Sequence, residues 1–316
     1  MSGNQVEVVA LIDFPEVTDK RLRENFVVHN LYEADDQAAM LKELAPRVRG
    51  VATMGQIGCT AEIMAALPNL EIISCYAVGV DAVDMPAARE HDVIVTNTPD
   101  VLNDCVADLA VGLTISLLRD IPNADHFVRN EPWYTPTDYP LTRALGGKTL
   151  GVVGLGRIGM GAAKRAQAFG MNIAYHNRSK RDDVDFAYYA SPAELAANCD
   201  VMVLLCPGGP ATQHLIDKDV LDALGPDGFL VSISRGTVVD EAALVDALVN
   251  NRIAGAAMDV FEHEPQVPDA LKQARNVILT PHMGSGTRET RAAMGNLMID
   301  NLIAHFSGKP VLTRVE

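Results

Sequence analysis

The sequence has few cysteines and a deficit of positive charge. Five cysteines occur among 316 residues, and no two of them form a Cys-x-x-Cys pair. This spacing argues against a disulfide framework or a zinc knuckle, so we expect a protein of the reduced cytoplasm. Lys and Arg total 26 against 41 Asp and Glu, which gives a formal net charge of −15. Because nucleic acids and anionic membranes bind cationic surfaces, we expect neither as a partner.

Long apolar segments are missing as well. The longest clearly strand-like apolar run, Val201 to Cys206, has six residues, whereas a transmembrane helix needs about 20. The apolar stretch at residues 6–12 has no basic region before it and is too short for a signal peptide. The eight histidines include no His-x-His or His-Glu-x-x-His pattern, and no carboxylates have calcium-loop spacing, so we expect no metal site.

Short apolar runs alternate with helical patterns along almost the whole chain. This alternation predicts α/β architecture with parallel sheets covered on both faces. The first series of strands is expected at residues 6–12, 26–30, 50–53, 71–75 and 93–96. The second series is expected at residues 149–153, 172–176, 201–206, 229–232, 254–259 and 277–279.

Two domains are expected from the length and from the two series of strands. A long helix is predicted to begin near Asn103, and the last periodic stretch, Arg288 to Phe306, is long enough to return to the first sheet. The first domain is therefore predicted to be discontinuous. We expect it to comprise residues 1–98 plus 286–316, and the second domain to comprise residues 99–285.

The strongest local signal is a glycine-rich turn at the start of the second series. Gly154, Gly156 and Gly159 form a Gly-x-Gly-x-x-Gly pattern after an apolar strand and before a predicted helix. In such a turn the first glycine permits the bend, the second admits a pyrophosphate, and the third lets the helix pack closely. We therefore predict a dinucleotide site. Its expected contacts here are Gly154, Leu155, Gly156, Arg157, Ile158 and Gly159.

The end of the next strand indicates which dinucleotide binds. A carboxylate that would hold the adenosine ribose is expected there, yet no acidic residue occurs before Asp182, and Asn177, Arg178 and Ser179 stand near the expected place. A carboxylate would repel a 2′-phosphate, whereas a guanidinium can bind it through two hydrogen bonds. We favour NADP, with NAD as a weaker substitute. The alternative is a solvated basic turn.

Six ordered motifs resemble those of the D-2-hydroxyacid dehydrogenases, and in particular the glyoxylate/hydroxypyruvate reductase branch. They are Val78-Gly-Val-Asp81, Asn97-Thr-Pro-Asp100, Gly154-Leu-Gly-Arg-Ile-Gly159, Ser234-Arg-Gly236, Asp259-Val-Phe-Glu-His-Glu-Pro265 and Thr280-Pro-His282. The resemblance covers nearly the whole chain. It implies a Rossmann domain for the cofactor, a flavodoxin-like domain for the substrate, and a homodimer formed through an arm around residues 119–146. Trp133, in that arm, could reach the partner's active site or could serve only as a packing anchor.

The resemblance also implies three catalytic residues. Arg235 would bind the substrate carboxylate and its carbonyl oxygen with a permanently charged fork. His282 would be the acid/base, because imidazole exchanges protons near working pH. Glu264, which directly precedes Pro265, matches the family glutamate better than Glu262 does, and a carboxylate there would stabilise an imidazolium. The alternatives are a surface ion pair, a structural histidine and an ordinary loop acid.

Further contacts follow from the same resemblance. The substrate carboxylate would be received by backbone amides at Val78 and Gly79, with Met54 and Gly55 closing the pocket. The remaining expected cofactor contacts are Cys206, Pro207, Ile233, Ser234, Arg235, Asp259, His282 and Gly284. Asp259 would help to hold the nicotinamide carboxamide. The Pro-Gly-Gly-Pro that follows Cys206 departs from the usual family sequence.

The expected activity is reduction of glyoxylate to glycolate and of hydroxypyruvate to D-glycerate, with hydride from NADPH and a proton from His282. A reductase of hydroxyphenylpyruvate or phenylpyruvate is the nearest alternative. A formate dehydrogenase is disfavoured because that relative carries glutamine in place of Glu264, and a phosphoglycerate dehydrogenase because few residues follow the last helix. A dinucleotide-sensing interaction protein on the same fold is a remote alternative.

Overall fold

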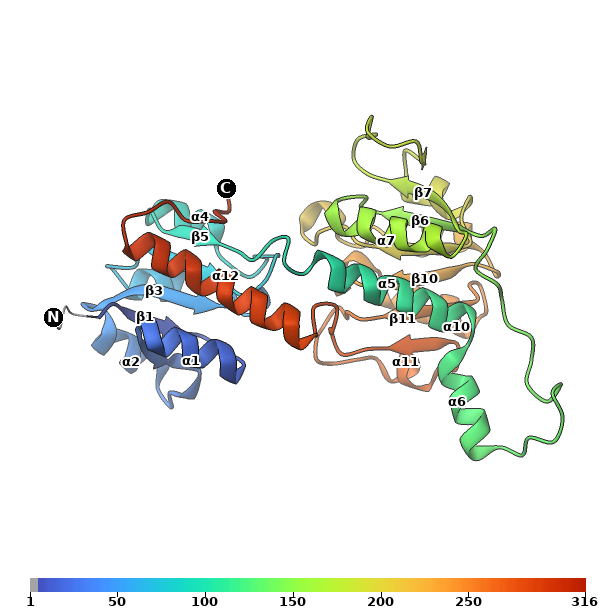
Figure 1. Ribbon diagram of the computed structural model, residues 1–316, viewed down its shortest axis with the longest axis horizontal. Helices are drawn as coiled ribbons and strands as arrows, with labels where there is room; N and C mark the ends of the chain where they lie inside the picture. The colour runs from blue at the N-terminus through green and yellow to red at the C-terminus, as the bar shows by residue number, and fades with distance from the viewer. Residues whose placement is uncertain (1–4) are drawn as a thin grey trace. The chain divides into compact units, whose positions relative to one another are not determined.

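The computed structural model describes residues 5–316 and divides into two compact units (Figure 1). The first unit contains the residues up to Leu102 together with Thr287–Glu316, and the second contains Asn103–Gly286. The boundary after Leu102 coincides with the start of helix α5 (Asn103–Leu118), which packs on the second sheet. The sequence predicts the two boundaries between the domains after residues 98 and 285, whereas the structure divides the chain after Leu102 and after Gly286.

The first unit is built on a five-stranded parallel sheet with the order β2-β1-β3-β4-β5. Its strands are β1 (Glu7–Ala10), β2 (Val27–Asn30), β3 (Val48–Thr53), β4 (Ile72–Cys75) and β5 (Ile94–Thr96). Its helices are α1 (Glu16–Asn25), η1 (Leu31–Glu33), α2 (Gln37–Leu44), α3 (Ala61–Ala66), α4 (Met85–Glu90) and α12 (Arg288–Phe306). The order 2-1-3-4-5 is that of flavodoxin-like sheets.

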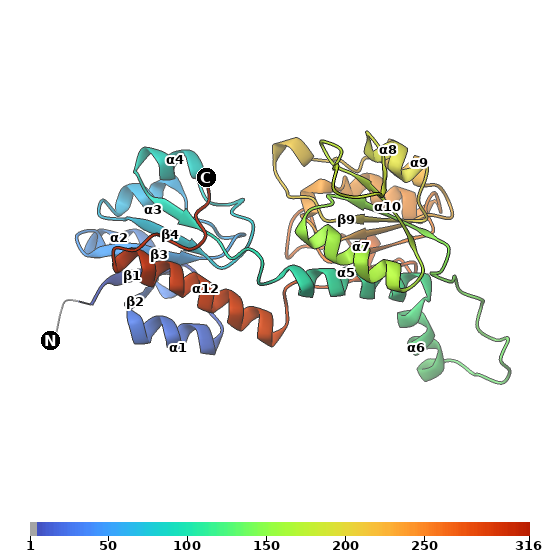
Figure 2. The same cartoon turned by 45° about the horizontal axis from the view of Figure 1, so that its top comes forward.

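Helices cover both faces of this first sheet. Helices α2, α3 and α4 share a buried apolar cluster with one face, to which Leu41, Met64 and Ile73 belong. Helix α12 packs against α1 and β4, as Figure 2 shows, and Ser74 Oγ donates to Met298 O at 2.8 Å. The C-terminal helix thus belongs to the first unit.

The second unit contains a seven-stranded parallel sheet with the order β12-β11-β10-β9-β6-β7-β8. Its strands are β6 (Thr149–Val153), β7 (Asn172–His176), β8 (Ala187–Tyr188), β9 (Val201–Leu204), β10 (Phe229–Ser232), β11 (Gly255–Met258) and β12 (Val277–Leu279). If β6 is counted as the first strand, the neighbouring strands β8-β7-β6-β9-β10-β11 follow the 3-2-1-4-5-6 order of a Rossmann sheet. Strand β12 is added beside β11. The prediction of two doubly wound parallel-sheet domains is confirmed.

Helices also lie on both faces of the second sheet. Helix α5 packs beside α7 (Arg157–Ala168), while the opposite face shares a buried cluster with residues of α8 (Pro192–Ala196), α9 (Lys218–Leu224) and α10 (Glu241–Val249). The remaining short elements are η2 (Pro210–Thr212), η3 (Gly236–Val238) and α11 (Asp269–Gln273). The central strands β9 and β10 are buried along their whole length, as strands covered on both faces must be.

Helix α6 (Ile121–Asn130) and strand β8 of the second unit depart from the predicted series of strands and helices. Helix α6 buries none of its residues, and β8 has only two residues at the sheet edge. The proline-rich stretch after α6, expected as an extended excursion, contains no helix or strand from Glu131 to Lys148. Within residues 5–316, no helix has both the length and the apolar character needed to cross a bilayer.

Candidate active site

Three of the predicted site residues follow three neighbouring strands. Arg235 comes shortly after β10, Asp259 directly after β11 and His282 shortly after β12. These strands are adjacent and parallel, so their carboxyl ends lie at one edge of the sheet. Ligands of open α/β sheets bind at this edge.

His282 and Glu264 form a direct pair. His282 Nδ1 lies 2.8 Å from Glu264 Oε2, and the side chains are 33% and 21% exposed. The other carboxylate oxygen, Glu264 Oε1, accepts a hydrogen bond from Phe261 N at 3.0 Å. Glu262 instead pairs with His214 Nε2 at 2.8 Å, and this hydrogen bond raises the pKa of His214. Of the two candidate glutamates, the structure thus brings Glu264 to the histidine.

Asp259 organises the loop that carries His282. Its buried carboxylate accepts hydrogen bonds from Thr280 Oγ1 at 2.6 Å, Met283 N at 2.8 Å and Gly284 N at 2.9 Å. Burial raises the pKa of this carboxyl, and the three donors oppose that rise. Its backbone carbonyl also accepts from His282 N at 2.8 Å. Asp259, which the sequence predicts as a contact of the nicotinamide carboxamide, thus also supports this loop, a role that the sequence does not indicate.

The segment that contains Arg235 packs against the loop that contains Glu264. A Cβ on Gly236 would lie 1.9 Å from the carbonyl carbon of Phe261, so only glycine permits this approach. The buried Glu241 carboxylate accepts from Glu262 N at 2.8 Å, and burial raises its pKa. The sequence does not indicate this role of Glu241. Acidic residues are common in the first turn of a helix, where they interact favourably with the helix dipole.

The glycine-rich turn has the shape that a pyrophosphate requires. Gly154 has a φ of +94°, and a Cβ there would lie 2.5 Å from Cys206 N, so the turn packs tightly against the end of β9. A Cβ on Gly159 would lie 2.5 Å from Gly154 O, whereas one on Gly156 would meet nothing within 4 Å. The open side of Gly156 adjoins the first turn of α7, whose N–H groups point out of the helix. The turn therefore fits a dinucleotide.

The loop after β7 is tied to this turn through Leu155. Leu155 N donates to Asn177 Oδ1 and Leu155 O accepts from Arg181 Nη1, both at 2.7 Å. Arg178 and Ser179 are exposed between these two anchors. The sequence does not indicate that Arg181 anchors this loop. Arg178 and Lys180 are basic residues of the same turn, and no sequence pattern distinguishes Arg181 from them.

Residues expected to bind the substrate carboxylate meet within the first unit. A Cβ on Gly55 would lie 2.4 Å from Gly79 O, and Ala82 N donates to Gly55 O at 3.3 Å. The structure thus brings the Met54–Gly55 turn against the loop that contains Val78 and Gly79. Both loops follow strand ends, β3 and β4, at the carboxyl edge of their sheet.

The other predicted cofactor contacts lie at the carboxyl edge of the second sheet. Ile233 and Ser234 are buried, and Ser234 Oγ has no hydrogen-bond partner among residues 5–316. Pro207 is exposed after β9, and burial raises the pKa of the neighbouring Cys206 thiol to about 11. In the same residues no three His, Cys, Asp or Glu side chains form a group that could hold a metal.

Comparison with known proteins identifies the family. The profile of the D-isomer specific 2-hydroxyacid dehydrogenase NAD binding domain matches residues 111–284. Hydroxyphenylpyruvate reductase of Plectranthus scutellarioides is 46% identical over 310 residues, which cover 98% of this chain and 99% of that protein. The chain belongs to the D-isomer-specific 2-hydroxyacid dehydrogenase family.

Two further relatives of this 2-hydroxyacid dehydrogenase are reductases of small acids. Glyoxylate/hydroxypyruvate reductase A of Arabidopsis thaliana is 42% identical over 310 residues, covering 98% of this chain and 99% of that protein. The NADPH-dependent glyoxylate/hydroxypyruvate reductase of Sinorhizobium meliloti, solved with NADP and malonate, has a TM-score of 0.90 and 39% identity, covering 99% and 97% of the two chains. The protein is thus an oxidoreductase that acts on 2-oxo or 2-hydroxy acids with a nicotinamide dinucleotide.

Proposed function

We propose that the protein is an NADPH-dependent reductase that converts glyoxylate to glycolate and hydroxypyruvate to D-glycerate. The observation that carries this proposal is the 2.8 Å pair between His282 and Glu264 at the sheet edge that also carries Arg235. An imidazole held by a carboxylate is a proton donor, and a guanidinium is a receptor for a carboxylate. Together these groups suit the reduction of a 2-oxo acid.

In the proposed mechanism, each residue has one task. Arg235 binds the substrate carboxylate and orients its 2-oxo group, assisted by the backbone amides at Val78 and Gly79. His282 transfers a proton to the carbonyl oxygen, and Glu264 stabilises the imidazolium before that transfer. NADPH, when bound, supplies the hydride that reduces C2. His282 then regains a proton from water, which balances the reaction.

The choice of NADPH rests on the loop after β7. Arg178 is exposed there, and among the described residues it forms no ion pair, while Asn177 and Arg181 fix the loop to the glycine-rich turn. Residues 177–181, which follow β7, include no acidic residue that would repel a 2′-phosphate, and the carboxylate of Asp183 is paired with Arg181. The NADP complex of the S. meliloti relative agrees with this assignment.

Arg178→Ala is therefore expected to raise KM for NADPH by roughly 10–100-fold, the value of a charge-assisted contact to phosphate. The KM for NADH should stay within about twofold, because NADH has no 2′-phosphate. Initial rates with each cofactor at saturating glyoxylate measure both constants on the same preparation. Equal losses for the two cofactors would contradict the assignment.

Substrate profiling tests the proposed function. Initial rates of NADPH and NADH oxidation should be measured with glyoxylate, hydroxypyruvate, pyruvate, phenylpyruvate and hydroxyphenylpyruvate. The proposal expects the highest kcat/KM with NADPH and the first two acids. Preference for an aromatic acid would favour the second candidate, a hydroxyphenylpyruvate reductase, which is what the P. scutellarioides relative is named. Binding of NADPH without any turnover would favour a dinucleotide sensor.

A homodimer formed through residues 119–146 belongs to the same proposal. This arm leaves large apolar side chains in solvent, among them Trp133, Tyr134 and Leu141. Exposed apolar surface of this kind is typical of protein–protein contacts. We expect wild-type protein to sediment as a dimer at micromolar concentration, and Trp133→Ser with Tyr134→Ser to shift the equilibrium toward monomer. A monomeric wild type would contradict this arrangement.

A further inference from the structure

The loop that follows β4 is held by a side chain from the end of β5. Asn97 Nδ2 donates to Val78 O at 2.8 Å, and Thr98 N donates to Ala77 O at 2.8 Å. Val78 C=O and Gly79 N–H belong to the same planar trans peptide, in which the two groups point in opposite directions. The hydrogen bond from Asn97 therefore sets the direction of Gly79 N–H.

The opposite end of Gly79 is fixed by close packing. A Cβ on Gly55 would lie 2.4 Å from Gly79 O, so no side chain fits between these backbones. The peptide group before Gly79 is thus held by a hydrogen bond, and the carbonyl after it is held by a neighbouring turn. Both constraints restrict rotation of the Gly79 amide, one of the two amides that the proposed function assigns to the substrate carboxylate.

Asn97 is in turn held by the segment 312–315. Asn97 N donates to Thr313 O at 3.2 Å, and Thr313 Oγ1 donates to Asn97 O at 2.6 Å. Next to this pair, Thr96 forms an antiparallel bridge with Arg314, and Val315 N donates to Val95 O at 2.8 Å. The segment thus lies along β5 and engages both backbone groups of Asn97.

A buried asparagine of α12 fixes the position of this segment. Asn301 is fully buried, and its Oδ1 accepts from Leu312 N at 2.9 Å and Thr313 N at 3.1 Å. Its Nδ2 donates to Thr313 Oγ1 at 2.8 Å and to Leu297 O at 2.9 Å. All four hydrogen-bonding positions of the amide are used, so the orientation of Thr313 is closely specified.

We infer that Asn97 is a positioning residue for substrate binding, which directs Gly79 N–H toward the substrate carboxylate, and that Thr313 holds Asn97 in this orientation. The inference rests on the proposed function, because it requires that the Gly79 amide bind a 2-oxo acid. A hydrogen bond to a charged group depends strongly on direction. Loss of the Asn97 contact should therefore weaken substrate binding and leave cofactor binding unaffected.

Asn97→Ala is the first test. We expect KM for glyoxylate to rise about 10-fold, the value of one weakened hydrogen bond to a charged group, while KM for NADPH changes less than about twofold. Asn69→Ala is the matched control, because Asn69 Nδ2 also donates to a backbone carbonyl, Pro46 O, at 3.1 Å in the same unit. Asn69 precedes β4, at the opposite edge of the sheet, so its loss should leave both constants unchanged.

Thr313 gives a second test that does not alter the loop itself. Thr313→Val removes the hydroxyl and should raise KM for glyoxylate several-fold, whereas Thr313→Ser retains the hydroxyl and should restore it. An unchanged KM in Asn97→Ala and Thr313→Val, or equal losses for glyoxylate and NADPH, would overturn the inference while wild-type turnover keeps the proposed function. A wild type that reduces no 2-oxo acid would overturn both.

Discussion

Replacing His282 with glutamine is expected to lower kcat for glyoxylate reduction by roughly 10²–10⁴-fold, the usual contribution of a general acid. Glutamine retains polarity near Glu264 but has no proton to transfer to the carbonyl oxygen. The KM for NADPH should change far less than kcat does, because the proposed proton transfer takes place at the substrate. Steady-state kinetics of the purified variant measure both. His91→Gln is the matched control, since His91 is exposed at the end of α4 in the other unit.

Wild-type turnover in His282→Gln would remove the histidine from the mechanism. Glu264→Gln separates the charge of the pair from its geometry, because the amide can still accept from His282 Nδ1. Without the carboxylate the imidazolium that donates the proton loses its charged partner, which lies 2.8 Å away. We expect kcat for glyoxylate to fall, but by less than in His282→Gln, because the amide keeps the contact and loses only the charge. An unchanged kcat would show that Glu264 acts through position alone.

Much of the fold could be predicted because buried parallel strands are short, apolar and separated by helices. The expected strands at 149–153, 172–176, 229–232 and 277–279 coincide with β6, β7, β10 and β12, and the expected helix 288–306 coincides with α12. The sequence did not reveal β8, because two residues at a sheet edge carry no period. Helix α6 was not predicted either, and none of its residues is buried.

From the sequence, the positions of site residues could be predicted only where those residues lie at the end of a predicted strand. Arg235 and His282 each follow a predicted strand and Asp259 ends one, and parallel strands bring their carboxyl ends to one edge. The division of labour between Glu262 and Glu264 depends on the course of a loop. His214, which binds Glu262, lies 48 residues away in the chain. No local pattern reports such a contact.

Residues that support the site indirectly, by holding other residues in place, could not be predicted from local sequence patterns either. Glu241 and Arg181 support the site through backbone groups, which have no signature in the side-chain sequence. Asn301 and Thr313 belong to the C-terminal part of the chain, yet they reach the loop after β4 through Asn97. Such supporting contacts arise from the packing of distant segments and become apparent only in three dimensions.

Arg235→Ala should lower kcat/KM for glyoxylate by roughly 10²–10³-fold, because truncating one partner of a desolvated charge pair costs about 2–5 kcal/mol. Arg235→Lys should recover only part of this loss, since an ammonium keeps the charge but lacks the planar fork. The surrounding backbone should persist in both variants, because the close approach to the backbone of Phe261 is made by Gly236. Melting temperatures near that of the wild type would verify this.

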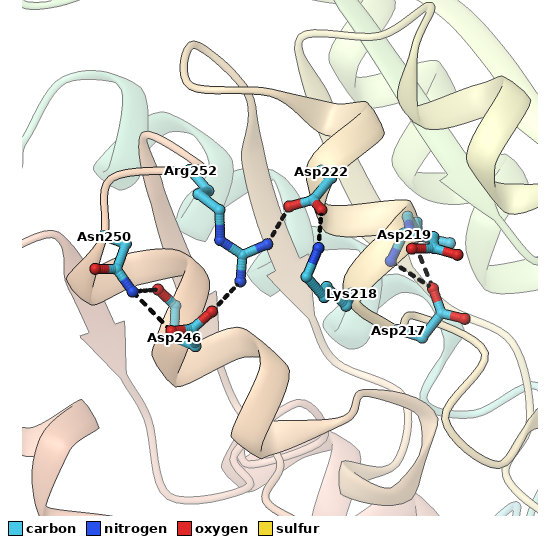
Figure 3. Close-up of polar contacts among 8 residues, drawn as sticks. Asp217, Lys218, Asp219, Asp222, Asp246, Asn250 and Arg252 are labelled. Atoms are coloured by element: carbon cyan, nitrogen blue, oxygen red, sulfur yellow. Dashed lines mark hydrogen bonds and ion pairs between the residues drawn. The ribbon is translucent and has the colours of Figure 1, made fainter.

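Arg252→Ala provides a matched loss of a guanidinium away from the site. Arg252 pairs with Asp222 and Asp246 just before β11 (Figure 3), at the amino edge of the sheet, whereas Arg235 follows β10 at the carboxyl edge. A 2-oxo amide, which lacks the carboxylate charge, separates binding from chemistry. Its slower reduction should be far less sensitive to Arg235→Ala than that of glyoxylate is. Equal sensitivity would mean that Arg235 does not recognise the carboxylate and acts on the carbonyl oxygen alone.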